Sequence, residues 1–298
     1  MSSMTRVGVV GAGRVGAVLA AALRGAGHEV VAAAGESAAS RTRIETLLPG
    51  VPVHKPTAVA RASDVLLLTV PDDMLANVVT MLAASGAIRP GQQVVHTSGK
   101  HGLAVLRPAA AVGAEILALH PAMTFTGTDR DLPRLAGCVY GVTAEPATRA
   151  LAEALVADLG GRLVTVAEEY RSLYHAGLAH GANHLVTLVS QAMDLLRATG
   201  ADDPASTLRP LLTAALDNAL CYGDAALTGP VVRGDVETVR AHLVDIAATA
   251  PGTVDAYVAM ARATAERAVL DGRLLPIRAA ALTRVLDGAR PAPVGRPR

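Results

Sequence analysis

The chain has 298 residues, of which 51% are hydrophobic, so it is long enough for one large core or two fused ones. Its 27 basic and 26 acidic side chains leave a formal charge of +1, and only 2% of the residues are aromatic, which disfavours nucleic acid as a partner. No secretion signal and no apolar run of about eighteen residues is visible, and Cys138 and Cys221 form neither a disulfide framework nor a metal motif. We therefore expect a cytoplasmic protein with reduced cysteines, no bound metal and no membrane partner.

The first predicted strand, residues 7–10, leads into Gly11-Ala12-Gly13-Arg14-Val15-Gly16 and then into an alanine-rich helix. A strand followed by G-x-G-x-x-G and a helix is the dinucleotide-binding pattern. We expect Gly11 to make the tight turn, Gly13 to let the backbone approach a pyrophosphate and Gly16 to allow close helix packing. The first N–H groups of the helix would face the phosphates. The alternative is a glycine turn that binds nothing.

Short apolar segments then alternate with helical ones, which is typical of parallel βαβ units. The further predicted strands are residues 30–34, 64–71, 92–96, 114–120, 138–142 and 163–166, with a helix at 146–159 before the last of them. Most of these strands are apolar throughout. Such strands are buried on both faces of a sheet, and their C-terminal ends open onto a ligand crevice.

The residues at these strand ends are candidates for the crevice. Lys100, four residues after the strand 92–96, is a candidate catalytic group, and His120 is a candidate substrate contact. The alternative for the histidines is that they hold their own loops by hydrogen bonds. The predicted cofactor contacts at the strand ends are Val70, Pro71, Asp72, His96 and Ser98.

From Glu168 the pattern becomes helical, with one long helix at 168–199 and a break at 200–204 before further helices. We predict a dinucleotide-binding domain at 1–168, a helical domain at 169–290 and a disordered proline-rich tail at 291–298.

Two later segments carry further candidates. In the long helix, His175 and Asn183 lie on one face among small residues at about 100° per residue, and we expect both to be catalytic. The alternative is that the small residues only allow close helix packing. In the segment 227–235, Arg233 would suit a substrate carboxylate, while Asp235 caps the next helix. The alternative for Arg233 is a solvated surface position.

The motifs together resemble the oxidoreductase family in which a Rossmann-like domain precedes the domain of unknown function numbered 2520. That family is similar to β-hydroxyacid dehydrogenases, ketopantoate reductases and pyrroline-carboxylate reductases. The resemblance is carried by residues 11–16, 96–99, 120–121, 174–176, 183, 228–235 and 242–243. It implies an α/β Rossmann dinucleotide-binding domain followed by an all-helical dimerisation domain, similar to the C-terminal domain of 6-phosphogluconate dehydrogenase. It also implies a homodimer.

One position departs from the better-known relatives, which carry a lysine four residues before the helix asparagine. This chain has Ala179 there, so either His175 or Lys100 transfers the proton to or from the substrate, or the chemistry differs.

The coenzyme is predicted from the segment after the second strand. Glu36 has the spacing expected for NAD, whereas Ser37 and Arg41, together with Ser40 and Arg43, make a cradle for the extra phosphate of NADP. We expect NADP, with NAD as the alternative.

These observations predict an NAD(P)-dependent oxidoreductase that acts on a small keto or hydroxy acid, with ketopantoate as the first candidate. The alternatives are a prephenate dehydrogenase-like enzyme, a pyrroline-type imine reductase, and a nucleotide-binding redox sensor without turnover.

Overall fold

The computed structural model describes residues 4–289, and the predicted tail at 291–298 lies outside them. The chain divides into two compact units, one that ends at Asn183 and one that begins at His184. This division falls inside the long helix α7 (Arg171–Ala198). The limits of the predicted domains, 1–168 and 169–290, stay a prediction.

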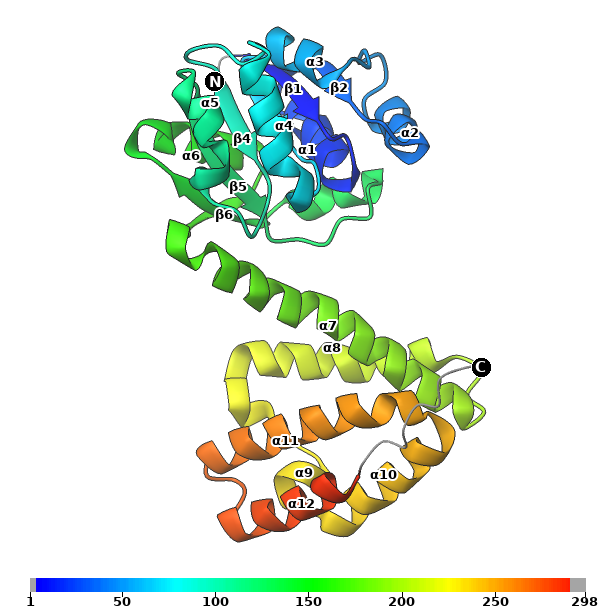
Figure 1. Ribbon diagram of the computed structural model, residues 1–298. Helices are drawn as coiled ribbons and strands as arrows, with labels where there is room; N and C mark the ends of the chain where they lie inside the picture. Colours follow the sequence, from blue (N-terminus) through cyan, green and yellow to red (C-terminus); the bar gives the residue numbers. More distant parts are fainter. Residues whose placement is uncertain (1–3, 290–298) are drawn as a thin grey trace, which may run out of the picture. The chain divides into compact units, whose positions relative to one another are not determined.

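Within residues 4–289, seven strands form one sheet in the spatial order β2-β1-β3-β4-β5-β6-β7 (Figure 1). They are β1 (Arg6–Val10), β2 (Glu29–Ala34), β3 (Val65–Leu68), β4 (Gln93–His96), β5 (Glu115–Pro121), β6 (Val139–Ala144) and β7 (Arg162–Thr165). All neighbouring strands are parallel except β5 and β6, which are antiparallel. The first five strands are parallel as predicted, and β6, whose direction was not predicted, runs antiparallel to β5. A parallel pair needs a long crossover, usually a helix, and the segment between β5 and β6 contains only the short 3-10 turns η2 (Asp129–Asp131) and η3 (Pro133–Leu135).

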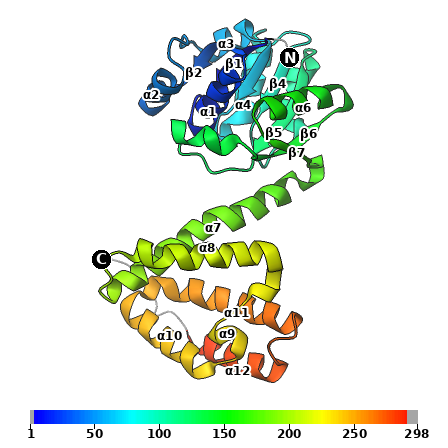
Figure 2. The same ribbon diagram turned by 180° about the vertical axis from the view of Figure 1, so that it is seen from behind.

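Helices cover both faces of this sheet, and Figures 1 and 2 view it from opposite sides. One buried cluster contains residues of α1 (Arg14–Gly25), α2 (Ala38–Leu47) and α6 (Arg149–Asp158). The other contains residues of α3 (Pro56–Ala62), α4 (Asp72–Ala84) and α5 (Arg107–Ala111). Because both faces are covered, the strands are apolar along their whole length.

The strand register places the functional edge. Val10 lies opposite Leu68, and Leu68 lies opposite His96, so β1, β3 and β4 end together. The strand order reverses at β1, between β2 and β3, and ligands of open α/β sheets bind at such a point.

The second unit contains the end of α7 and five further helices among the described residues: α8 (Pro204–Tyr222), α9 (Pro230–Arg233), α10 (Val236–Thr249), α11 (Val254–Leu270) and α12 (Pro276–Gly288). Its buried core is built by α9 to α12 and the turn before α12. The remaining 3-10 turns are η1 (Leu103–Leu106), η4 (Pro146–Thr148), η5 (Glu168–Tyr170), η6 (Gly223–Ala226) and η7 (Pro251–Thr253). None of the helices in residues 4–289 has the length and apolar character needed to cross a membrane.

Candidate functional site

The glycine turn after β1 has the geometry that its sequence pattern predicts. Gly11 has a φ of +96°, and a Cβ atom there would lie 2.7 Å from the backbone nitrogen of Val70. A Cβ atom on Gly16 would collide with the side chain of Thr69, whose hydroxyl donates a hydrogen bond of 2.6 Å to the Gly11 carbonyl. A Cβ atom on Gly13 would make only an ordinary contact, 3.8 Å from the Gly11 carbonyl oxygen, and no side chain caps the start of α1. The first N–H groups of α1 are therefore free of a side-chain acceptor and suited to an anion.

A cavity of about 680 Å³ extends from this turn along the C-terminal edge of the sheet. Its volume lies in the range of ligand sites. The predicted site residues that line it are Gly11, Gly13, Arg14, Val15, Ser37, Val70, Pro71, Asp72, Ser98, His120 and His175. The structure thus brings together residues from strand ends that are far apart in the sequence and from the first turns of α7.

Other predicted residues lie elsewhere. Ala12 and Gly16 are buried beneath the turn, and Arg41 is exposed on α2, where it donates a hydrogen bond of 2.9 Å to the Glu36 carbonyl. Lys100 and Asn183 are exposed and do not line the cavity. Arg233 belongs to the second unit, where its side chain is also exposed. Roles for Lys100, Asn183 and Arg233 stay predictions.

His96 does not line the cavity either, because its side chain is fully buried. Its Nε2 lies 2.9 Å from the Gly102 carbonyl, and its Nδ1 accepts a hydrogen bond of 3.1 Å from the Ser98 backbone. The imidazole therefore holds the loop after β4, which is the alternative that the sequence left open. Burial lowers the pKa of His96 from 6.5 to about 4, so it is neutral at pH 7.

The opposite end of the cavity holds two histidines in contact. The rings of His120 and His175 are edge to face with centroids 6.1 Å apart. Both rings are close to Gly99: a Cβ atom there would lie 2.6 Å from His175 Cδ2 and 3.0 Å from His120 Nε2. Burial lowers the pKa of His120 to about 4, and the charge of Arg171 adds to this effect. This end of the cavity thus offers two imidazole rings, and that of His120 is neutral at pH 7.

Two residues that the sequence analysis did not assign to the site support these histidines. The hydroxyl of Tyr174 lies 3.1 Å from His120 Nδ1. Arg171, only 1% exposed, donates hydrogen bonds to the backbone carbonyls of Ser98, His101 and Gly141. Arg171 forms no ion pair within residues 4–289. Neither contact has a local sequence signal, because each joins α7 to strands or loops at least 30 residues away.

The N-terminus of α2 forms the other rim of the cavity, with Glu36, Ser37 and Ser40 in its lining. The Ser37 hydroxyl caps α2 by accepting a hydrogen bond of 3.1 Å from the Ser40 backbone, and the two hydroxyls are 2.8 Å apart. Arg14 lies on the same rim and forms no ion pair in the described part of the chain. This rim thus combines hydroxyls, a helix N-terminus and an unpaired guanidinium with one carboxylate.

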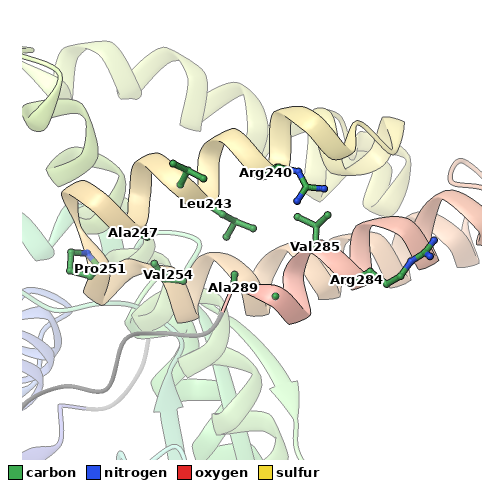
Figure 3. A pocket seen from close by; sticks show the side chains of 10 residues that line it. Arg240, Leu243, Ala247, Pro251, Val254, Arg284, Val285 and Ala289 are labelled. Atoms are coloured by element: carbon green, nitrogen blue, oxygen red, sulfur yellow. The ribbon is translucent and has the colours of Figure 1, made fainter.

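A second cavity, of about 560 Å³, lies within the helical unit between α10 and α12 (Figure 3). Its polar side chains are the two exposed arginines Arg240 and Arg284, and Leu243 and Val285 belong to its apolar wall. It contains no acid–base pair. Among residues 4–289 there is also no group of three His, Cys, Asp or Glu side chains that could hold a metal ion.

The segment before α10 has a structural explanation for most of its pattern. Gly229 and Gly234 have φ angles of +96° and +69°, which favour glycine. Asp235 caps α10 by accepting a hydrogen bond of 3.2 Å from the Thr238 backbone, as predicted. Only Arg233 is left without such a role.

Comparison with known proteins agrees with this architecture. The model of the Rossmann-like domain matches residues 2–121, and the model described as Domain of unknown function (DUF2520) matches residues 138–264. The two matches follow one another along the chain in that order. No curated protein matches the sequence.

Solved structures show the same fold over almost the whole chain. A Bacteroides fragilis protein proposed to be an NADP oxidoreductase has a TM-score of 0.77 at 19% identity, covering 88% of this chain and 98% of its own. A reductive aminase from Aspergillus terreus in complex with NADPH and ethyl levulinate has a TM-score of 0.64 at 19% identity, covering 95% and 99%. A Plasmodium falciparum pyrroline carboxylate reductase with NADP bound has a TM-score of 0.57 at 12% identity, covering 89% and 100%. The predicted fold class, a Rossmann domain followed by a helical region, is confirmed.

Proposed function

We propose that this protein is an NADP-dependent oxidoreductase that reduces a C=O or C=N bond in a small molecule. The observation that carries the proposal is the cavity itself, which joins the glycine turn to His120 and His175. One end has the features of a dinucleotide-binding turn, and the other has two imidazoles that can hydrogen-bond a reacting heteroatom. Three solved structures of the same fold, named as NADP oxidoreductase, reductive aminase and pyrroline carboxylate reductase, support the class.

NADP is favoured over NAD by the rim at α2. The hydroxyls of Ser37 and Ser40, the N-terminus of α2 and the unpaired Arg14 would hold a 2′-phosphate. Glu36 opposes this because its carboxylate would repel a phosphate and suits a ribose hydroxyl. Three favourable groups against one make NADP the better fit.

The residues of this chain would have separate roles in binding the coenzyme and the substrate. The amides at the start of α1 would hold the pyrophosphate, and Gly13 leaves room for it. The coenzyme supplies the hydride when it is bound. His120 and His175 would hydrogen-bond the substrate heteroatom, and His120 is neutral at pH 7 because its pKa is about 4.

For the substrate we propose a small keto acid or a cyclic imine. Ketopantoate stays the first keto acid to test, and the names of the reductive aminase and the pyrroline carboxylate reductase add imines. This chain has Ala179 where the better-known relatives have a lysine. This fits either substrate class, because His120 and His175 would provide N–H groups in its place.

We also propose that the helical unit forms a homodimer. Its core is built by α9 to α12, and large apolar side chains on α7 and α8 stay exposed. They are Leu185, Val186, Leu188, Leu211, Leu216, Leu220 and Tyr222. A soluble monomer rarely exposes so many apolar groups on two consecutive helices, and a second copy would cover both sets by symmetry.

The test is a coenzyme titration followed by an activity screen. We expect calorimetry to show tighter binding of NADPH than of NADH. We then expect NADPH absorbance to fall with at least one member of a panel of keto acids and cyclic imines. If neither coenzyme binds, the proposal is wrong. If NADPH binds and no panel member is reduced, the result favours the alternative of a redox sensor without turnover.

A further inference from the structure

Tyr174 lies next to the proposed catalytic histidines but has no role in the reaction as proposed so far. Its hydroxyl lies 3.1 Å from Nδ1 of His120, and the two rings are edge to face with centroids 5.6 Å apart. The His120 nitrogen on the other side of the ring, Nε2, is the one that comes close to Gly99 in the cavity wall. The imidazole therefore stands between Tyr174 and the cavity.

The sheet is shaped to admit this tyrosine. His120 on β5 is the register partner of Gly141 on β6. A Cβ atom on Gly141 would collide with the Tyr174 hydroxyl, so a residue without a side chain is needed there. Tyr174 sits one helical turn after Arg171, whose guanidinium carbon lies 5.8 Å from the centre of the Tyr174 ring.

The protonation states allow Tyr174 to donate to His120. Burial raises the pKa of Tyr174, while the charge of Arg171 and a hydrogen bond from the Gly141 backbone oppose the rise, so the phenol keeps its proton at pH 7. His120 is neutral at pH 7, since burial, Arg171, His175 and His96 lower its pKa and only Asp72 opposes them. The phenol can therefore donate its proton to His120 Nδ1. The Nε2 atom then carries the N–H that faces the cavity.

We propose that Tyr174 is a positioning residue which holds His120 in the Nε2–H tautomer and resupplies its proton, making His120 the proton donor of the reaction. This inference rests on the proposed oxidoreductase function.

The step balances in atoms and charge. The substrate carbon gains the hydride with its electron pair, so the carbon is reduced and NADPH is oxidised. The C=O or C=N π bond breaks, and its electron pair takes the Nε2 proton of His120. Nδ1 accepts the Tyr174 proton at the same time, so the imidazole stays neutral. The phenolate that remains lies beside the Arg171 guanidinium. After product release, Nε2 takes a proton from solvent and Nδ1 returns its proton to the phenolate, which restores the Nε2–H tautomer.

Arg171 also fixes the position of α7, which carries Tyr174. Its three hydrogen bonds tie α7 to the loop after β4 and to β6, which fixes the distance between Tyr174 and His120. Its buried charge has no carboxylate partner within residues 4–289, and removing a buried guanidinium that is fully hydrogen-bonded is destabilising. Tyr174 is therefore the better residue to change.

The decisive experiment is a ¹⁵N NMR titration of the full chain without coenzyme, with the His120 signals assigned by His120→Asn. We expect the wild type to show the Nε2–H tautomer with a pKa near 4. Tyr174→Phe removes a donor that stabilises the neutral ring, so we expect the His120 pKa to rise toward 6.5. Tyr170→Phe is the matched control, because Tyr170 is 59% exposed and should leave both properties unchanged.

The opposite hydrogen bond, from Nδ1–H to the phenol oxygen, gives the opposite results. The wild type would then show the Nδ1–H tautomer, and Tyr174→Phe would leave the His120 pKa unchanged or lower it. Either result overturns the inference. The tautomer of the wild type decides the matter even if the variant fails to fold.

Kinetics add a second readout once a substrate is known. We expect His120→Asn to lower kcat about 10²- to 10⁴-fold and Tyr174→Phe to lower it to a smaller extent, with the NADPH Kd unchanged in both. If His175→Asn abolishes turnover while His120→Asn does not, His120 is not the donor. The NMR result needs neither coenzyme nor turnover, so it separates failure of this inference from failure of the proposed function.

Discussion

The two compact units bury their apolar side chains in different ways. The first has a sheet covered by helices on both faces, and its two clusters bury most of its large apolar side chains. The second buries a core between α9 and α12 but exposes Leu216, Leu220 and other apolar groups along α7 and α8. The first unit buries its large apolar side chains mainly against its own sheet, whereas the second leaves apolar groups that we propose a second copy covers.

The units also differ in where they keep ionisable groups. The first buries His28, His96, Asp131 and Arg171 and partly buries His120, and three of these, His96, His120 and Arg171, lie at or next to the cavity. In the second unit, the described histidines His184 and His242 are exposed. Burying ionisable groups destabilises a fold unless they are hydrogen-bonded, so their concentration in one unit indicates where the chemistry takes place.

Acid should therefore destabilise the first unit selectively. The pKa values of His96 and His120 are about 4 in the folded chain and 6.5 in the unfolded chain, so the unfolded state binds more protons between these values. Their contribution is fully present above pH 6.5 and is lost as the pH falls toward 4, by on the order of 3 kcal/mol for each histidine. Hydrogen exchange at pH 7 and pH 4, corrected for the intrinsic rate, should show lost protection in β4 and β5 and little change in α10 to α12. Equal loss in both units would contradict the comparison.

Closing the space beside the glycine turn should have the next largest effect. In Gly16→Ala the new methyl group would collide with the Thr69 side chain, and overpacking of this kind costs about 1–3 kcal/mol. We expect weaker NADPH binding by calorimetry and a lower melting temperature. The matched control is Gly25→Ala in the same helix, where no heavy atom lies within 4 Å of the new methyl group. If both variants bind NADPH equally well, the turn does not hold the coenzyme.

A charge on the exposed face of the helical unit should have the smallest effect on the fold and a clear effect on assembly. We expect the wild type to sediment as a dimer and Leu220→Glu to shift it toward monomer, because a carboxylate would be buried against the second copy. Leu270→Glu on α11 is the control, since Leu270 is 86% exposed and lies outside α7 and α8. NADPH binding to the first unit should persist in both variants. A monomeric wild type at micromolar concentration would show that the second copy is not the partner.

The sequence predicted the order of strands and helices well because each element carries its own local signal. Apolar strands, the glycine turn and the Asp235 cap depend on residues near one another in the chain. The antiparallel direction of β6 was not predicted, since strand direction depends on how the intervening segment folds back and not on the strand's own residues.

The candidate site was predictable to a lesser extent. Residues at strand ends, such as Asp72 and His120, follow from the rule that ligands bind at that edge of a sheet. Tyr174 and Arg171 were not assigned to the site, because their partners are 54 residues away for Tyr174 and between 30 and 73 residues away for Arg171. The glycines at 99 and 141 likewise have a reason only in three dimensions, where they make room for rings from other elements.

The hydrogen bonds of Arg171 have a consequence for how this site tolerates change. All three of its acceptors are main-chain carbonyls, which every amino acid provides. Replacing the side chains at positions 98 and 101 therefore leaves the acceptors of this tie in place. The cavity wall can therefore be changed at position 98 without removing an acceptor of Arg171.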